Sequence, residues 1–261
     1  MKVPLSSWRS IIYFPFNLIA APVNLVFCIP IVGRLMKWAW NMFLTILYIP
    51  FGLIEWVLLI KGYKPEKRLR LSIVVNTDKN GGPVVETSQV VKQLEDTVAL
   101  FKDKANILVQ SANFNASLKP SLDWIYIHKN PSPQRVNRVG CNKTALWEDL
   151  WITGTTFQFT ALTRLFHTNF WRIIGYGSPI VVYVVEDVKG FLGCSLGPFT
   201  DYVTVSGKGV ICMAHEIGHA CNLIHEHQDK SNLMHPLGCR NNTLTTEQIA
   251  FMRASRHVTF I

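Results

Sequence analysis

Two N-terminal stretches with almost no charge constrain the fold of this chain more than any other feature. Residues 11–32 carry no charged side chain, and residues 38–60 carry only Glu55. A helix of about 20 apolar residues crosses a bilayer core, so each stretch is long enough to do so. A cleaved signal peptide has one shorter apolar core, and a buried hairpin in a soluble protein is the other alternative. We therefore predict a membrane-associated helical segment over residues 1–61.

Prolines leave the geometry of this segment open. Pro15, Pro22 and Pro30 interrupt the first stretch and Pro50 the second, and each bends a helix. Two full spans and a hairpin that enters one leaflet both remain compatible with the sequence. Glu55 should face a partner or water rather than lipid. Tryptophans near the ends of the stretches are expected as interface anchors, namely Trp8, Trp38, Trp40 and Trp56.

The basic excess of the chain is concentrated beside this segment. Residues 1–70 hold nine Lys or Arg against two acidic residues, whereas residues 71–261 hold 17 against 15. Basic residues that flank apolar segments suit an anionic membrane surface, and residues 62–70 form a basic linker. The predicted partner is a lipid bilayer, and no nucleic acid is expected.

The remainder, residues 71–261, has the pattern of one α/β domain. Strands are predicted at residues 71–76, 107–110, 124–128, 179–185 and 202–206, and helices at residues 90–101, 158–171, 215–223 and 246–255. Thr87 and Thr246 are the expected N-caps of two of these helices.

The stretch "HEIGHACNLIHEHQDKSNLMHP" contains a potential metal site. His215 and His219 are four residues apart, so on a helix both imidazoles project from one face toward a single ion. His225 can add a third ligand if the chain leaves the helix and turns back over residues 221–224. Asn222 suits that turn because asparagine readily adopts positive φ. An HExxH pattern alone recurs by chance, but the third histidine and the following "SNLMHP" favour a metal site.

Glu216 follows the first of these histidines. Its carboxylate can reach a water bound to the metal, accept a proton from it and pass the proton to a leaving amine. His227 and His235 flank the three histidines and are weaker ligand candidates. His128, His167 and His257 are expected at the surface or at its boundary.

These residues resemble the metzincin zinc proteases, whose signature is HExxHxxGxxH followed by a methionine turn. The resemblance implies one catalytic Zn²⁺ held by His215, His219 and His225, with Glu216 as general base and Met234 packed beneath the ligands. It also implies a twisted mixed sheet, an active-site helix, a Met-turn and a C-terminal helix, here preceded by an α-helical membrane hairpin.

The same resemblance predicts where a protein or peptide substrate lies. The substrate would pair with an edge strand near residues 191–196, and its side-chain pocket would follow the methionine turn. The implied substrate-binding residues are Phe191, Leu192, Gly193, Cys194, Pro236 and Leu237.

The sequence departs from the family pattern in ways that leave the subfamily unassigned. Asn222 replaces the usual glycine, and Pro236 occupies the position of the tyrosine ligand of astacin-type members. His235 lies where matrix-type members often have tyrosine. Cys141 is a weak candidate to mask the zinc.

The cysteines and the charges point to opposite sides of the membrane. Five cysteines follow the apolar segment, so at least one is unpaired, and Cys194 and Cys239 could form a bridge. Asn115, Asn142 and Asn241 begin glycosylation sequons, which also favour an extracytoplasmic protease domain. If both helices cross, however, the positive-inside rule places the domain in the cytoplasm. The oligomeric state is not predicted.

The predicted function is a membrane-anchored zinc endopeptidase, an enzyme of the hydrolase class. The alternative is a catalytically silent, zinc-stabilised binding module at a membrane. The presence of Glu216 favours the enzyme, because a structural zinc would not need it and would prefer a fourth protein ligand.

Overall fold

The computed structural model describes residues 5–113, 116–141, 143–208, 212–237, 239 and 241–260, with side chains from residue 12 onward. The side chain of Trp8 and the sequon residues Asn115 and Asn142 lie outside the described part.

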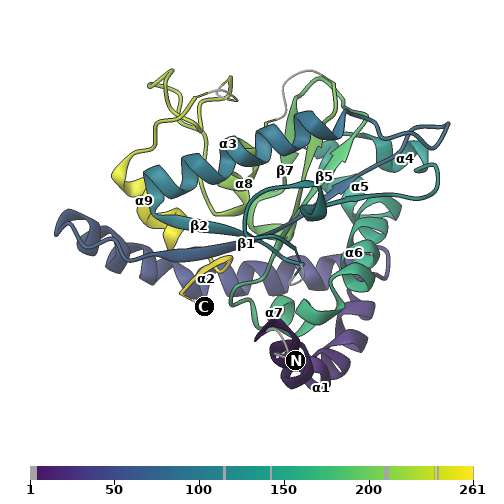
Figure 1. Ribbon diagram of the computed structural model, residues 1–261, viewed down its shortest axis with the longest axis horizontal. Coiled ribbons are helices and arrows are strands. Elements are labelled where there is room, and N and C mark those ends of the chain that lie inside the picture. The colour runs from purple at the N-terminus through teal and green to yellow at the C-terminus, as the bar shows by residue number, and fades with distance from the viewer. Residues whose placement is uncertain are drawn as a thin grey trace.

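The fold is mixed α/β, with a largely parallel sheet and an apolar N-terminal helical layer (Figure 1). The strands are β1 (Lys67–Val75), β2 (Ile107–Ser111), β3 (Ile125–Ile127), β4 (Arg138–Val139), β5 (Ile180–Val185), β6 (Asp187–Val188), β7 (Gly193–Ser195), β8 (Tyr202–Ser206) and β9 (Val258–Thr259). The helices are α1 (Leu5–Val26), α2 (Val32–Ile60), α3 (Thr87–Ala105), α4 (Gln134–Asn137), α5 (Lys143–Leu150), α6 (Ile152–Arg164), α7 (Asn169–Ile174), α8 (Met213–Ala220) and α9 (Thr246–Arg253). Short 3₁₀ turns occupy Leu122–Trp124, Phe166–Thr168 and Gly197–Phe199.

The main sheet has the strand order β2-β1-β5-β8-β7. β1 pairs in parallel with β2, β3 and β5, and β5 pairs in parallel with β8. β7 joins β8 antiparallel at the end of this order, and β9 joins β1 antiparallel. β4 and β6 form a separate parallel pair.

The two faces of the sheet are both covered, as parallel sheets require. Val182 and Val184 of β5 belong to one apolar core, which includes residues of α3 and α8. Tyr183 and Val185 point the other way, into a second core with Phe157 of α6. All six residues of β5 are therefore buried, in agreement with their continuous apolar sequence.

Most predicted elements are confirmed, with differences at their ends. The prediction of one helix over residues 158–171 is wrong, because that region is split into α6, a 3₁₀ turn and α7. β1 begins at Lys67 rather than residue 71, so part of the predicted basic linker is a strand. The N-cap of α9 is Thr245 rather than the predicted Thr246, and Thr245 forms a capping box with Gln248. Glu86, not Thr87, precedes α3, and its side chain makes no capping hydrogen bond.

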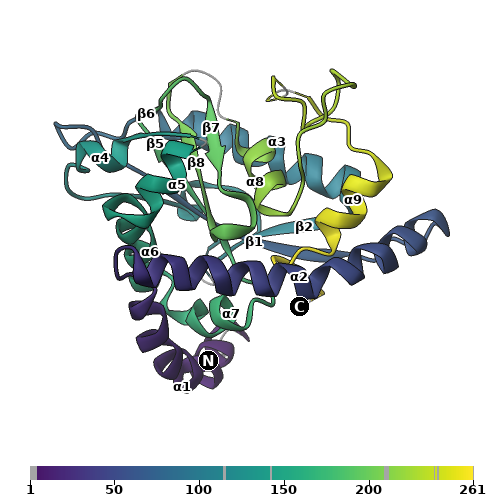
Figure 2. The same ribbon diagram turned by 180° about the vertical axis from the view of Figure 1, so that it is seen from behind.

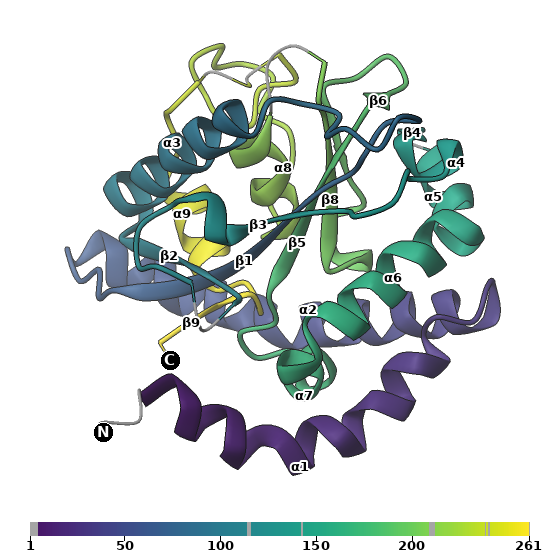
Figure 3. The ribbon, with the colours of Figure 1, turned by 45° about the vertical axis from the view of Figure 1, so that its right-hand side comes forward.

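Helix α2 alone, among the described residues, is long and apolar enough to cross a membrane. It lies along the domain, however, and its contacts with α9 are extensive (Figure 2). Both N-terminal helices lie on the same side of the molecule and meet at one end, with α7 between them (Figure 3).

Buried ion pairs attach α2 to the α/β part. Glu55 accepts a hydrogen bond from Arg253 at 2.8 Å and lies 2.6 Å from the ammonium of Lys67. The prediction that Glu55 faces a partner rather than lipid is therefore confirmed. Arg34 binds Asp149 through both carboxylate oxygens, at 2.8 and 2.9 Å.

Two of the tryptophans expected near a membrane interface also contact the domain, and one histidine is more buried than expected. Trp38 donates to Asp149 at 2.6 Å and Trp40 to the carbonyl of Ile173 at 2.6 Å, so the indole N–H groups of both face the domain. His257 is buried rather than at the boundary, with its Nδ1 2.7 Å from the carbonyl of Ser178.

The predicted Cys194–Cys239 bridge is wrong. The disulfides join Cys141 to Cys194 and Cys212 to Cys239, and Cys221 stays unpaired, in line with the odd number of cysteines in the domain. Which cysteines pair depends on the distances between them in the folded chain, and the spacing of the cysteines in the sequence does not give these distances.

Candidate metal centre and cleft

Helix α8 presents His215 and His219 on one face, one turn apart. Their Nε2 atoms lie 3.1 Å from each other. The helix packs its other face into the core through Met213 and Ile217, which are fully buried. That packing fixes the direction of the imidazoles.

A sharp turn after α8 brings in the third histidine. Asn222 has φ 74°, as predicted for this position, and Leu223 donates its N–H to the carbonyl of Gly218 at 3.0 Å. The chain then reverses, so that Nε2 of His225 lies 3.2 Å from Nε2 of His219. The three ligand atoms all lie within 4.8 Å of one another, so this cluster could hold a metal ion.

Backbone carbonyls fix the tautomers of two of the rings. Nδ1 of His215 lies 2.7 Å from the carbonyl of Leu233, and Nδ1 of His219 lies 2.8 Å from that of Leu223. A carbonyl only accepts, so each Nδ1 carries the proton and each Nε2 presents a lone pair. Two such lone pairs cannot hydrogen-bond each other, and their 3.1 Å separation suits a pair of ligands that share one cation.

Desolvation favours the neutral form of these imidazoles. Desolvation lowers the pKa of His219 to about 4, and it also lowers the pKa values of His215 and His225. Neutral imidazole is the form that binds metals. The lowered pKa values therefore favour the form of these rings that can bind a cation.

Glu216 is buried beside the edge strand β7. A Cβ atom on Gly193 would lie 2.6 Å from both Cγ and Oε1 of Glu216, so glycine there makes room for the carboxylate. Burial raises the pKa of the Glu216 carboxyl to about 8.

Met234 lies in a turn beneath α8. Its side chain is fully buried, and a Cβ atom on Gly218 would lie 2.6 Å from its sulfur. The turn is held by Asn232, whose Oδ1 accepts the N–H of Met234 at 2.8 Å. Met234 therefore supports the middle of the helix that carries the first two histidines.

One cavity of about 1210 Å³ joins the histidines to the sequence-predicted substrate residues. Its lining includes the three histidines and Glu216, together with Phe191, Leu192, Gly193, Cys194, Pro236 and Leu237. β7 runs along it as the last strand of the sheet order.

Sequence reasoning missed one wall of this cavity. Thr45, Tyr48 and Ile49 of α2 line it, and so does Phe251 of α9. α9 approaches closely there, since a Cβ atom on Gly52 would lie 2.9 Å from the Phe251 ring. The polar residues of α2, which recur at helical spacing, were the available sign that this helix packs on the domain.

The weaker candidates lie outside the cluster. The His227 ring lies edge-on to that of His225, with the ring centroids 5.9 Å apart, and Nδ1 of His235 accepts the N–H of Leu237 at 3.2 Å. Cys141 is bonded to Cys194, so it has no thiolate with which to mask a metal.

Compared with protein-family models, the sequence matches none, and comparison with curated proteins gives no significant match either. The function of the protein is therefore inferred from the site itself.

Proposed function

We propose that this protein is a zinc-dependent endopeptidase of metzincin type, held at a membrane by its N-terminal helices. The observation that carries the proposal is the convergence of three imidazole nitrogens in a cavity that also contains a buried glutamate and an edge strand.

The donor set fits zinc. Zinc favours nitrogen and sulfur ligands, and Zn–N bonds of about 2.0–2.1 Å in a tetrahedron place the nitrogens about 3.3 Å apart. The Nε2 separations of 3.1 and 3.2 Å are close to this value. Among the described residues the cluster offers three ligands, which leaves one position for water or substrate, as catalytic zinc sites do.

The roles of the side chains follow from their positions. Zinc, when bound, would supply a Lewis acid that polarises the scissile carbonyl. Glu216 would take a proton from the attacking water as the new C–O bond forms. It would then deliver that proton to the amine nitrogen as the C–N bond breaks. The substrate backbone would add to β7 as a further strand.

Three features support the family assignment beyond the ligands. Met234 lies in a turn under α8, Asn222 takes the positive φ for which family members use glycine, and the C-terminal helix α9 follows.

The test compares the full-length protein with Glu216→Gln and with Glu226→Gln as a matched control. Glu226 lies next to the third histidine but is not part of the cavity lining. We expect all three proteins to bind one zinc, and Glu216→Gln alone to lose about 10²–10⁴-fold in peptide cleavage. Stoichiometric zinc in a wild-type protein that cuts no member of a peptide library would instead favour the silent binding module.

A further inference from the structure

Helix α2 has its polar and apolar faces reversed relative to a helix of a water-soluble protein. Its three charged residues, Arg34, Lys37 and Glu55, are all buried. The opposite face is apolar and exposed, including Met36, Phe43, Leu47 and Ile54. These four residues are 7, 4 and 7 positions apart, so they form one stripe along the helix.

The buried face cannot leave the domain easily. Lys37 lies 2.7 Å from Asp201, and Arg34 and Glu55 are paired with buried groups of α5, α9 and β1. If α2 separated from the domain to cross a bilayer, these charges would lose their partners on both sides. Unpaired buried charges are strongly unfavourable, so α2 stays on the domain.

Helix α1 repeats this arrangement. Asn17 donates to the carbonyl of His167 at 2.9 Å and Asn24 to that of Asn169 at 3.1 Å, so its amide-bearing face is toward the domain. Its outer face exposes Phe16, Leu18, Ile19, Val23 and Leu25, and the turn to α2 exposes Ile29 and Val32. The apolar surface therefore continues from one helix to the other.

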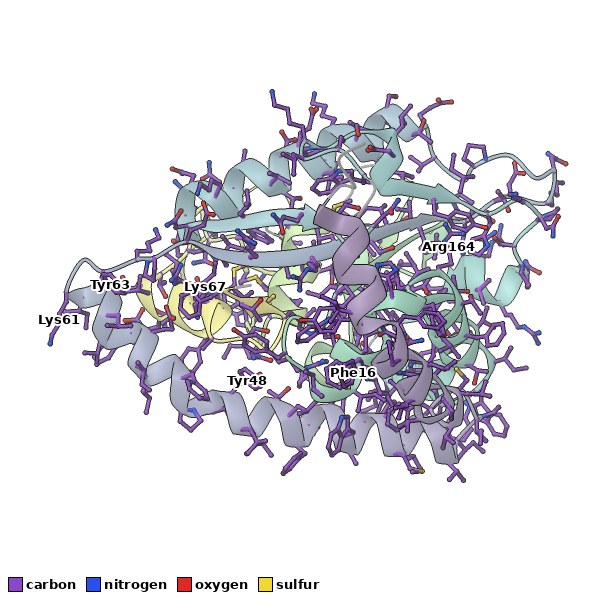
Figure 4. The ribbon with its side chains drawn as sticks, turned by 60° about the horizontal axis from the view of Figure 1, so that its bottom comes forward. Phe16, Tyr48, Lys61, Tyr63, Lys67 and Arg164 are labelled. Carbon is purple, nitrogen blue, oxygen red and sulfur yellow. A yellow bond between two sulfur atoms is a disulfide. The ribbon has the colours of Figure 1, made fainter. Side chains whose placement is uncertain are left out.

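A lipid leaflet is the occupant that fits this surface. The exposed apolar patches of monomeric soluble proteins rarely exceed a few hundred Å². The exposed apolar surface here extends along the whole of α2, which is about 43 Å long, and continues onto α1. A protein interface would add a polar rim, but the charged and amide side chains of α2 all lie on its buried face. At the end of α2, Lys61 and Tyr63 are exposed, as residues at the headgroup level would be (Figure 4).

The cleft of the proposed enzyme opens beside this surface. Tyr48 and Ile49 line the cavity, and Ile49 is half exposed at the border between the buried and the exposed face of α2. A leaflet that contacts the outer face of α2 would therefore lie at the edge of the cavity.

We propose that α1 and α2 lie flat in one leaflet, as an in-plane anchor rather than two spans, and that the cleft thereby selects polypeptide segments next to a membrane surface. The choice of substrate rests on the proposed protease function, whereas the in-plane anchor does not.

Depth measurements test the anchor without any catalysis. Spin labels would be placed at Met36→Cys, Phe43→Cys, Leu47→Cys and Ile54→Cys in the full-length protein bound to phosphatidylcholine vesicles, with and without phosphatidylglycerol. The unpaired Cys28 and Cys221 are buried and should not react. We expect all four labels at one shallow depth. A spanning helix would spread them over about 27 Å, because 18 residues separate the first from the last. Either that gradient or an absence of vesicle binding would overturn the proposal.

A pair of variants supplies the control for binding. Leu47→Glu with Ile54→Glu should abolish vesicle flotation, whereas Leu118→Glu with Leu122→Glu, two exposed leucines away from α1 and α2, should leave it unchanged. Equal loss of vesicle flotation in the two double variants would indicate nonspecific adsorption and contradict the assignment of the membrane-binding surface to α1 and α2.

The proposed preference for substrates next to a membrane is tested with one cleavable peptide, which is offered either free or tethered to the vesicle by a lipid. The wild type should cut the tethered form at least tenfold faster, and Leu47→Glu with Ile54→Glu should cut both at the free-peptide rate. Equal wild-type rates on both forms would overturn the substrate preference. If neither form is cut, the proposed protease function fails, while the depth result still decides the anchor.

Discussion

The two faces of helix α2 differ sharply in charge and polarity. The buried face carries Arg34, Lys37 and Glu55 against partners far along the chain, and the exposed residues of α2 are all apolar. Hydropathy averages the two faces and indicates a spanning helix. The spacing of the charges shows instead that the helix has a protein side, and this side also forms a wall of the cleft.

The largest effect should come from breaking the charge cluster on the buried side. Asp201 pairs with Lys37 at 2.7 Å and with Arg256 at 2.5 Å. Asp201→Asn would leave buried cations without their anion, which should lower the free energy of unfolding by about 3–5 kcal/mol. Glu66→Gln removes an exposed pair with Lys102 and should cost below about 1 kcal/mol. Similar losses in thermal or urea unfolding of the two variants would show that the buried cluster does not hold α2.

A second comparison uses two leucines three positions apart on α2. Leu44 is 5% exposed and Leu47 is 50% exposed. In lipid-free solution Leu44→Ala should cost about 2–5 kcal/mol, because it leaves a cavity against the domain. Leu47→Ala should change stability by no more than about 0.5 kcal/mol. If denaturant titrations showed equal destabilisation by Leu44→Ala and Leu47→Ala, the two faces of α2 would not differ in burial as the structure describes.

Acid should weaken the buried side selectively. Burial alone would raise the pKa of Asp201, but Arg256, Lys37 and Arg172 outweigh it and hold the pKa well below its usual 3.8. A pKa lowered in the folded state gives stability that is present above pH 3.8 and is lost as the pH falls through the folded-state pKa. The stability gap between wild type and Asp201→Asn, followed by unfolding at a series of pH values, should therefore narrow in acid. A gap that stays constant would contradict this account of Asp201.

The smallest effect is expected where the two faces meet at the cavity. Tyr48 lines the cleft but is not one of the proposed reacting groups. Tyr48→Ala should raise KM by roughly tenfold with kcat nearly unchanged, because it removes binding that is equal in the ground and transition states. Steady-state kinetics on a cleaved peptide provide the measurement. A fall in kcat at unchanged KM would place Tyr48 closer to the chemistry than the structure does.

What the sequence could predict was set by local spacing. His215 and His219 meet because one helical turn separates them, and Asn222 supports the turn that returns His225. The buried strand β5 was equally clear from its own residues. Each of these features depends on neighbours within about ten positions.

What the sequence could not predict depends on partners far away in the chain. Arg34 is paired with Asp149, 115 positions later, and Glu55 with Arg253, 198 positions later. The disulfide partner of Cys194 is likewise set by tertiary packing. The contribution of Thr45 and Tyr48 to the cleft follows from these long-range pairs, so composition alone could not place them.

The most direct test of the proposed catalytic zinc site is X-ray absorption at the zinc edge on the full-length protein. We predict three imidazole nitrogens at about 2.0–2.1 Å, one further oxygen ligand from water, and no sulfur at about 2.3 Å. Loss of one imidazole in His225→Ala would assign the third ligand. A sulfur neighbour or four imidazoles in the wild type would reveal a closed structural site and contradict the proposed enzyme.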